Sequence, residues 1–167
     1  MLESGLLRDA EGQLVMDGPM PPIAIPTTLQ GSLLARLDRL SATREVAQIG
    51  SAIGREFDYE LLAAVADLPA TRLLEALSQL EAAGLIFRRG SPPEAVYTFK
   101  HALVQDAAHD SLLRSRRQQL HARIAEAIER HYSETASNQP QLLAQHFAEA
   151  GFAERSARAW LQAGRLA

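Results

Sequence analysis

The stretch LIFRRGSPPEAVYTFK, residues 85–100, decides the fold class because its hydrophobic period differs from that of the sequence on either side. Its first five residues favour a strand, and the next five, with a glycine and two prolines, favour a turn. In the last six residues successive side chains alternate between two faces, which places Tyr97 and Phe99 on one of them. Val96 and Thr98 lie on the other face. We therefore predict a two-stranded hairpin.

Three helical segments precede this hairpin. The first begins at Ser41 and ends near Gly54, the second follows Asp58 as its N-cap, and the third covers residues 69–83 before Gly84. Their apolar stripes at helical spacing are Val46, Ile49 and Ile53, then Leu61, Leu62 and Val65, then Leu73, Leu77 and Leu80. Three helices followed by a two-stranded hairpin is the order of a winged helix.

The sequence after the hairpin returns to helical periodicity. We predict helices over residues 101–113, 117–132, 141–150 and 153–166, with a polar stretch at 133–139. Gly151 separates the last two helices, which resemble one tetratricopeptide-like hairpin with Trp160 as its core anchor. A single hairpin of this kind buries little surface and normally has a neighbour to stack on.

The first 40 residues differ in composition from the rest. Residues 6–16 are typical of a small hairpin or an extended arm around Glu11 and Gly12. Residues 17–26 hold four prolines and indicate an extended linker. A helix is then predicted from Thr27, and its stripe is formed by Leu29, Leu33, Leu37 and Leu40.

Composition narrows the class of protein. The 167 residues are 47% apolar but only 5% aromatic, which favours helices packed through Leu, Ala, Ile and Val. The net charge is −3, and no cysteine is present for disulfides, thiolate metal sites or nucleophiles. Neither a signal peptide nor an apolar run long enough to cross a bilayer is visible. We expect a cytoplasmic protein with no membrane partner.

Three blocks of sequence carry a resemblance to a known family. They are PTTLQGSLLARLDRL at residues 26–40, QIGSAIGREF at 48–57 and YTFKHALVQDAA at 97–108. Together they resemble bacterial multidomain signalling ATPases of the STAND class, over essentially the whole chain. Many such proteins carry a class III adenylate or guanylate cyclase domain ahead of an AAA-type ATPase core, and others end in a LuxR-type DNA-binding domain. His109 departs from the family pattern, which usually has a tyrosine there.

The resemblance implies an architecture and a division of the chain. Residues 1–40 would be the remnant of an ATPase lid and linker, 41–101 the winged helix, and 102–167 a helical region leading into tetratricopeptide-like repeats. The expected fold class is therefore mainly α: three helices plus a β-hairpin wing, flanked by the lid remnant and by helical hairpins. The resemblance also implies that the chain is a fragment of a longer protein.

The motifs needed for catalysis are missing from the sequence. No Gly-x4-Gly-Lys-Ser/Thr phosphate loop is present, and Lys100, the only lysine, falls on a predicted strand. The paired aspartates of a cyclase are also missing. We expect this chain to be no enzyme and to hold no cofactor itself, with ATP or ADP and Mg²⁺ bound by the intact parent.

His101 is the candidate binding residue. The resemblance implies that a histidine directly after the second wing strand contacts a nucleotide phosphate in the intact parent and holds its closed state. An imidazole can donate a hydrogen bond to a phosphate oxygen. The alternative is a histidine that caps the following helix or packs at the corner between strand and helix.

Two arginine groups invite other interpretations. The would-be recognition helix offers Arg72 beside Glu75 and Glu81, and the wing adds Arg88 and Arg89, which is little for phosphate contact. A second group lies at a predicted helix junction and consists of Arg114, Arg116, Arg117 and Arg123. These arginines either form a docking surface for an acidic partner or for nucleotide phosphates, or they only interact with helix ends and cover the surface. We do not expect DNA binding.

Three further histidines are candidate metal ligands. His121, His131 and His146 lack a shared helical spacing, so no zinc site is predicted.

The function expected from all of this is regulatory and non-catalytic. The fragment would couple nucleotide state in a signal-transduction ATPase to a helical-repeat sensor, with protein partners: the rest of the ATPase module, the repeats and the protein that they sense. The alternative is a DNA-binding winged-helix transcriptional regulator, and a third candidate is a protein scaffold without a switch. A winged helix alone does not separate these, because one fold serves many functions.

Overall fold

The computed structural model describes residues 7–10, 13–16, 32, 35 and 41–166. The predicted proline-rich linker lies outside these residues. So does the helix predicted from Thr27, apart from Ser32 and Ala35, which are helical.

The short hairpin predicted near the N-terminus is confirmed. Strand β1, Leu7–Ala10, pairs in antiparallel fashion with β2, Gln13–Met16, and the register places Leu7 opposite Met16.

The three helices and the hairpin predicted around residues 41–100 are confirmed. Helices α2, Ser41–Ile53, α3, Tyr59–Val65, and α4, Ala70–Ala82, are followed by strands β4, Ile86–Arg89, and β5, Val96–Phe99. Asp58 is the N-cap residue of α3, although its side chain makes no capping hydrogen bond. Gly84 adopts a φ of +73° just beyond α4, in the left-handed region that favours glycine.

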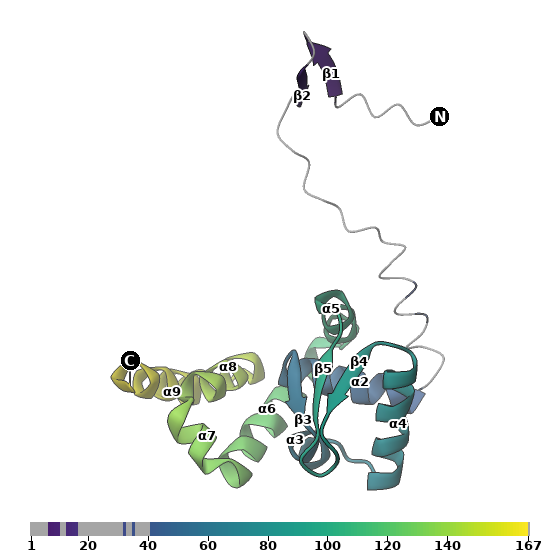
Figure 1. Ribbon diagram of the computed structural model, residues 1–167. Helices are drawn as coiled ribbons and strands as arrows, with labels where there is room; N and C mark the ends of the chain where they lie inside the picture. The colour runs from purple at the N-terminus through teal and green to yellow at the C-terminus, as the bar shows by residue number, and fades with distance from the viewer. Residues whose placement is uncertain (1–6, 11–12, 17–31, 33–34, 36–40, 167) are drawn as a thin grey trace.

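A third strand, β3, Glu56–Asp58, joins the hairpin and was not predicted. The order in the antiparallel sheet is β3–β5–β4, so β5 lies in the middle. Phe57 of β3 is opposite Tyr97, and Ile86 of β4 is opposite Phe99. Figure 1 shows this sheet beside α2 and α3, with α4 at its edge.

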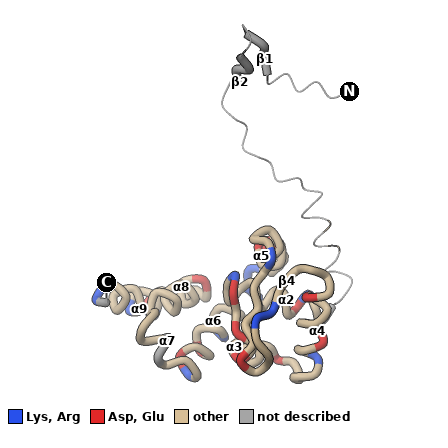
Figure 2. The backbone as a smooth tube through the Cα atoms, in the orientation of Figure 1, with Lys and Arg blue, Asp and Glu red and all other residues tan. Residues whose placement is uncertain are grey.

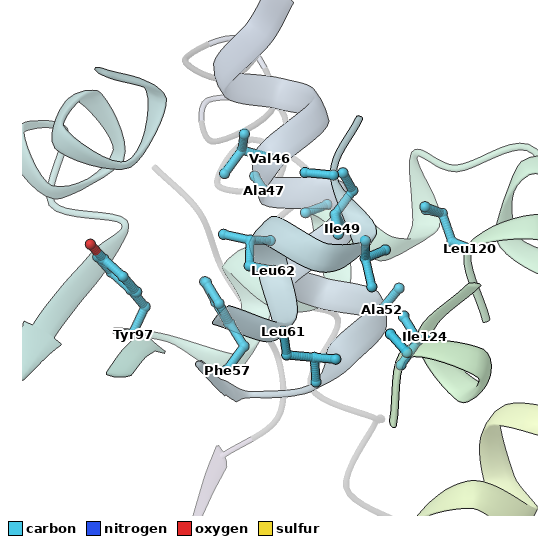
Figure 3. Packing of buried hydrophobic residues seen from close by; sticks show 14 of the residues in the cluster. Val46, Ala47, Ile49, Ala52, Phe57, Leu61, Leu62, Tyr97, Leu120 and Ile124 are labelled. Carbon is cyan, nitrogen blue, oxygen red and sulfur yellow. The ribbon is translucent and has the colours of Figure 1, made fainter. Parts of the chain in front are cut away.

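The hydrophobic core fills the space between the sheet and the helices. Tyr97 and Phe99 are each 1% exposed, and the Phe57 ring lies 5.8 Å and 5.5 Å from theirs. Side chains of α2, α3 and the later helix α6, Arg114–His131, converge on the same region (Figure 3). The alternation predicted for β5 is therefore confirmed, since its two aromatic side chains face this core.

The chain beyond the sheet is helical, as predicted. Helix α5, Ala102–Asp110, leads into α6, and α8, Pro140–Ala150, packs against both α6 and α9, Ala153–Leu166. Gly151 ends α8 with a φ of +85°. The predicted polar stretch instead holds a short helix, α7, Ser133–Asn138. In Figure 1, α8 and α9 lie side by side at the C-terminal end.

The described protein is therefore mainly helical with a small three-stranded antiparallel sheet. One hydrophobic cluster runs from Val46 to Ala159, and α5 and α6 both pack against α2. The division of the chain at residues 40 and 101 stays a prediction. Among the described residues, no helix has the length and hydropathy that crossing a membrane requires.

Candidate functional site

His101 lies at the corner that the sequence predicted, two residues beyond the end of β5 and at the N-cap of α5. Its carbonyl oxygen accepts a hydrogen bond from the amide of Val104 at 3.0 Å. Its side chain is exposed and forms no capping hydrogen bond. The imidazole therefore faces solvent at this corner instead of capping the helix, and a role in nucleotide binding stays a prediction.

The predicted basic group on α6 does not form one patch. Arg116 pairs with Glu45 of α2 at 3.2 Å, while a guanidinium nitrogen of Arg117 donates to the carbonyl oxygen of His109 at 3.3 Å. Arg123 instead lines a separate hollow beside Arg130. At least two of the four arginines thus have partners within the chain.

The arginines of the hairpin are also balanced by acidic residues. Arg88 lies 3.6 Å from Glu81, and Arg89 lies 3.7 Å from Glu56. Figure 2 shows basic and acidic positions interspersed over the sheet and the neighbouring helices. A polyanion would compete with these acidic side chains for each arginine.

Three histidines from different helices form a cluster that the sequence did not predict. His121 on α6 and His146 on α8 are both buried, and their Nδ1 atoms lie 2.8 Å apart. The ring of His109, on α5, meets the His121 ring edge-on at 6.0 Å between centroids. His131, which the sequence placed in the same group, is exposed at the end of α6. The packing of α6 on α8 creates this cluster, so local spacing could not predict it.

A sequence signal for the pair did exist. His121 lies three residues before Ile124 and belongs to the buried stripe of α6. His146 lies three residues after Leu143 in the buried stripe of α8. A histidine on the apolar face of an amphipathic helix needs a hydrogen-bond partner. When two such faces pack together, the histidine of one helix can be the partner of the histidine of the other.

Burial keeps these imidazoles neutral. It lowers the pKa of His146 to about 4, with a smaller contribution from His121. Burial also lowers the pKa of His121, against the opposing effect of the Glu149 carboxylate, and it lowers the pKa of His109, helped by the Arg117 guanidinium. At neutral pH one Nδ1–H therefore donates to the lone pair of the other Nδ1.

This arrangement fixes the chemistry of the outer ring nitrogens. The histidine that donates through Nδ1 has a lone pair at Nε2, whereas the one that accepts carries a hydrogen at Nε2. Both Nε2 atoms are buried and have no hydrogen-bond partner among the described residues. The pair thus offers one acceptor and one donor that nothing in the described chain uses.

A cavity of about 410 Å³ opens beside the pair, between α2, α5, α6, α8 and α9. His109, His121 and His146 line it. Its other polar walls are Ser51, Gln105, Asp106, Gln145 and Glu149. Within the part of the chain that the structure describes, no group of three or more His, Asp or Glu side chains is placed to hold a metal ion.

Trp160 also lines this cavity and corrects one prediction. We expected a core anchor, but 47% of the side chain is exposed. Helix α9 packs against α8 through the face that carries Ser156 and Ala159, which are both buried. Trp160 follows Ala159 by one residue and therefore lies about 100° further round the helix, away from that face.

Comparison with known proteins leaves the family open. No family model matches the chain, and no solved structure matches it. An uncharacterized protein of Rhizobium meliloti (strain 1021) is 29% identical over 140 residues. That match covers 83% of this chain but only 14% of the relative, so the chain spans a small part of the length of that protein.

The neutral histidines make stability depend on pH. Between pH 6.5 and about 4 the unfolded chain binds a proton at residue 146 that the folded chain does not, so the free energy of unfolding falls as pH falls. We expect a loss of about 2 kcal/mol at pH 5 relative to pH 8, measured by urea unfolding. His146→Gln should flatten this dependence, and His131→Gln, at an exposed position, should not. Equal slopes in all three proteins would contradict the assignment.

Proposed function

We propose that this chain is a non-catalytic regulatory segment of a nucleotide-switched signalling ATPase, in which residues 41–101 form a winged helix. The order of elements carries the proposal: α2, β3, α3, α4, β4 and β5, with β5 between the other two strands. Three helices and a three-stranded sheet that ends in a hairpin are the parts of a winged helix. The resemblance of residues 26–40, 48–57 and 97–108 to STAND-class ATPases supplies the functional part of the proposal.

The C-terminal hairpin supports a repeat-like role for α8 and α9. The hydroxyl of Ser156 donates to the carbonyl oxygen of Ala144 at 2.8 Å, and Ala144 and Ala159 are buried where the two helices pack together. The guanidinium of Arg155 lies 4.2 Å from the centre of the Phe147 ring, which closes the turn end of the hairpin. These contacts join two antiparallel helices closely, which is compatible with a tetratricopeptide-like unit.

The outer face of α9 fits a chain that continues into further repeats. Ala157, Leu161 and Gly164 lie along one side of the helix and are exposed, Leu161 to 67%. A following helical pair would cover this apolar face. The much greater length of the Rhizobium meliloti relative agrees with a place inside a long protein.

The mechanism follows from the position of His101. The exposed imidazole lies where the sheet meets α5, and α5 packs against α2. In the intact parent, a nucleotide phosphate would accept a hydrogen bond from this imidazole and hold the winged helix against the ATPase core. Loss of that bond would let the winged helix move as a rigid body with the helices packed on it.

A protein-binding role is preferred to DNA binding because of charge. Arg88 and Arg89 both have acidic neighbours, and the sequence carries a net charge of −3. Nucleic-acid binding draws its affinity mainly from unpaired cations that release counterions from phosphates. The resemblance to STAND-class ATPases is also the basis on which we propose a cytoplasmic location.

The test uses the longer polypeptide that this proposal requires. We expect the reading frame ahead of Met1 to encode a phosphate loop, and the purified protein to retain about one ADP or ATP per chain through gel filtration. Nucleotide content is measured by chromatography after denaturation. A longer protein without a phosphate loop, or one that elutes free of nucleotide after loading with Mg²⁺ and ADP, would contradict the proposal.

A further inference from the structure

The cavity beside the histidine pair has no part in the proposed function. Its walls come from five helices that also build the core, so the shape is fixed by packing and not by a loop. At about 410 Å³ it lies within the range of volumes that small-molecule sites occupy.

Two buried histidines contribute polar side chains to the cavity wall. His121 and His146 are 6% and 4% exposed, and the Nε2 atom of each has no hydrogen-bond partner among the described residues. Folded proteins rarely leave buried polar atoms unpaired, because each one costs free energy. Both rings line the cavity, while their Nε2 atoms are closed off from solvent.

The charge of the lining indicates the sign of a ligand. Asp106 and Glu149 contribute carboxylates, and the lining residues include neither lysine nor arginine. The Gln105 amide adds a carbonyl acceptor, since its nitrogen already donates to the carbonyl oxygen of Ser51 at 3.4 Å. The lining side chains thus carry two carboxylates and no cation, and the Arg117 guanidinium lies close enough to His109 and His121 to lower the pKa of both.

An aromatic face completes the site. Trp160 lines the cavity while 47% of it stays open to solvent, so a ligand can lie against its indole ring. Tryptophan is the side chain that attracts a cation most strongly through its ring face. A cavity lined by two carboxylates and an available indole favours a cation over an anion.

We propose that this cavity is a binding site for a small organic cation, a molecule that carries a protonated amine. The ammonium group donates to the Glu149 and Asp106 carboxylates, and its carbon skeleton packs against Trp160. The site goes beyond the regulatory function proposed above and does not rest on it.

The protein reports its own binding, since Trp160 is its single tryptophan. Three probes share one ring and differ in charge: benzylamine, benzyl alcohol and benzoate, titrated at pH 7.5 with EDTA present to exclude metal ions. We expect benzylamine to change the Trp160 fluorescence saturably, and the two other probes to bind at least about tenfold more weakly. Added salt should weaken benzylamine binding.

Matched variants separate the site from general surface charge. Glu149→Gln should weaken benzylamine binding on the order of fivefold, because it removes a lining carboxylate from an exposed position. Glu154→Gln removes an equal charge elsewhere, from an exposed pair with Arg158 on α9, and should change nothing. Equal binding of benzoate, equal effects of the two variants, or no saturable response to benzylamine would each overturn the proposal.

Discussion

Phe99→Ala is expected to lower the free energy of unfolding by about 3–5 kcal/mol. Phe99 lies on the central strand β5, is 1% exposed, and packs against the Phe57 ring at 5.5 Å between centroids. Truncation removes apolar contacts and leaves a cavity between the sheet and the helices. Domains of this size are stable by only about 5–15 kcal/mol, so the loss should lower Tm by roughly 10–15 °C.

Phe87→Ala is the matched control for this change. Phe87 lies on the neighbouring strand β4 but is 47% exposed, so its truncation should cost less than about 1 kcal/mol. Chemical unfolding followed by circular dichroism measures both variants. Similar losses at the two positions would mean that β5 does not turn its aromatic face toward the core.

Gly50→Val is expected to destabilise the protein by about 3 kcal/mol. A Cβ atom at position 50 would lie 2.9 Å from Cε1 and Cζ of Phe57, closer than carbon atoms pack. Phe57 cannot yield easily, because it is buried and its ring packs against those of both Tyr97 and Phe99. The two added methyl groups and the low helix propensity of valine increase the cost.

Gly164→Ala provides the opposite case. Nothing lies within 4 Å of a Cβ built at Gly164, which is on the exposed side of α9. This change should be neutral or stabilise the protein by up to about 1 kcal/mol, because alanine favours helix. Thermal unfolding of both variants compares them, and a stable Gly50→Val protein would show that α2 does not approach β3 as described.

Helices whose apolar stripe continues over several turns could be predicted from the sequence. The stripe of Leu73, Leu77 and Leu80 lies wholly in the core, as its spacing indicated. Strand β3 was missed because it has only three residues, of which Phe57 alone is buried. A segment this short does not show a recognisable alternation of apolar and polar residues. Helix α7 was missed because residues 133–138 show no apolar stripe.

The candidate site was harder to predict than the fold. The spacing of His121 and His146, which lie 25 residues apart, excludes a metal site on one helix but does not reveal that the two rings meet. Their contact depends on the register between α6 and α8, and a single sequence does not contain that register. Trp160 was expected inside the hairpin because it is large and apolar, but the phase of α9 turns it toward the cavity rim instead.

The rate of ADP release from the longer parent protein tests the central claim most directly. His101→Ala should speed the release of fluorescent ADP roughly tenfold or more, because a hydrogen bond to a charged phosphate is lost. His131→Ala, which removes another exposed histidine at the far end of α6, should leave the rate unchanged. An ADP release rate that His101→Ala does not alter would contradict the account.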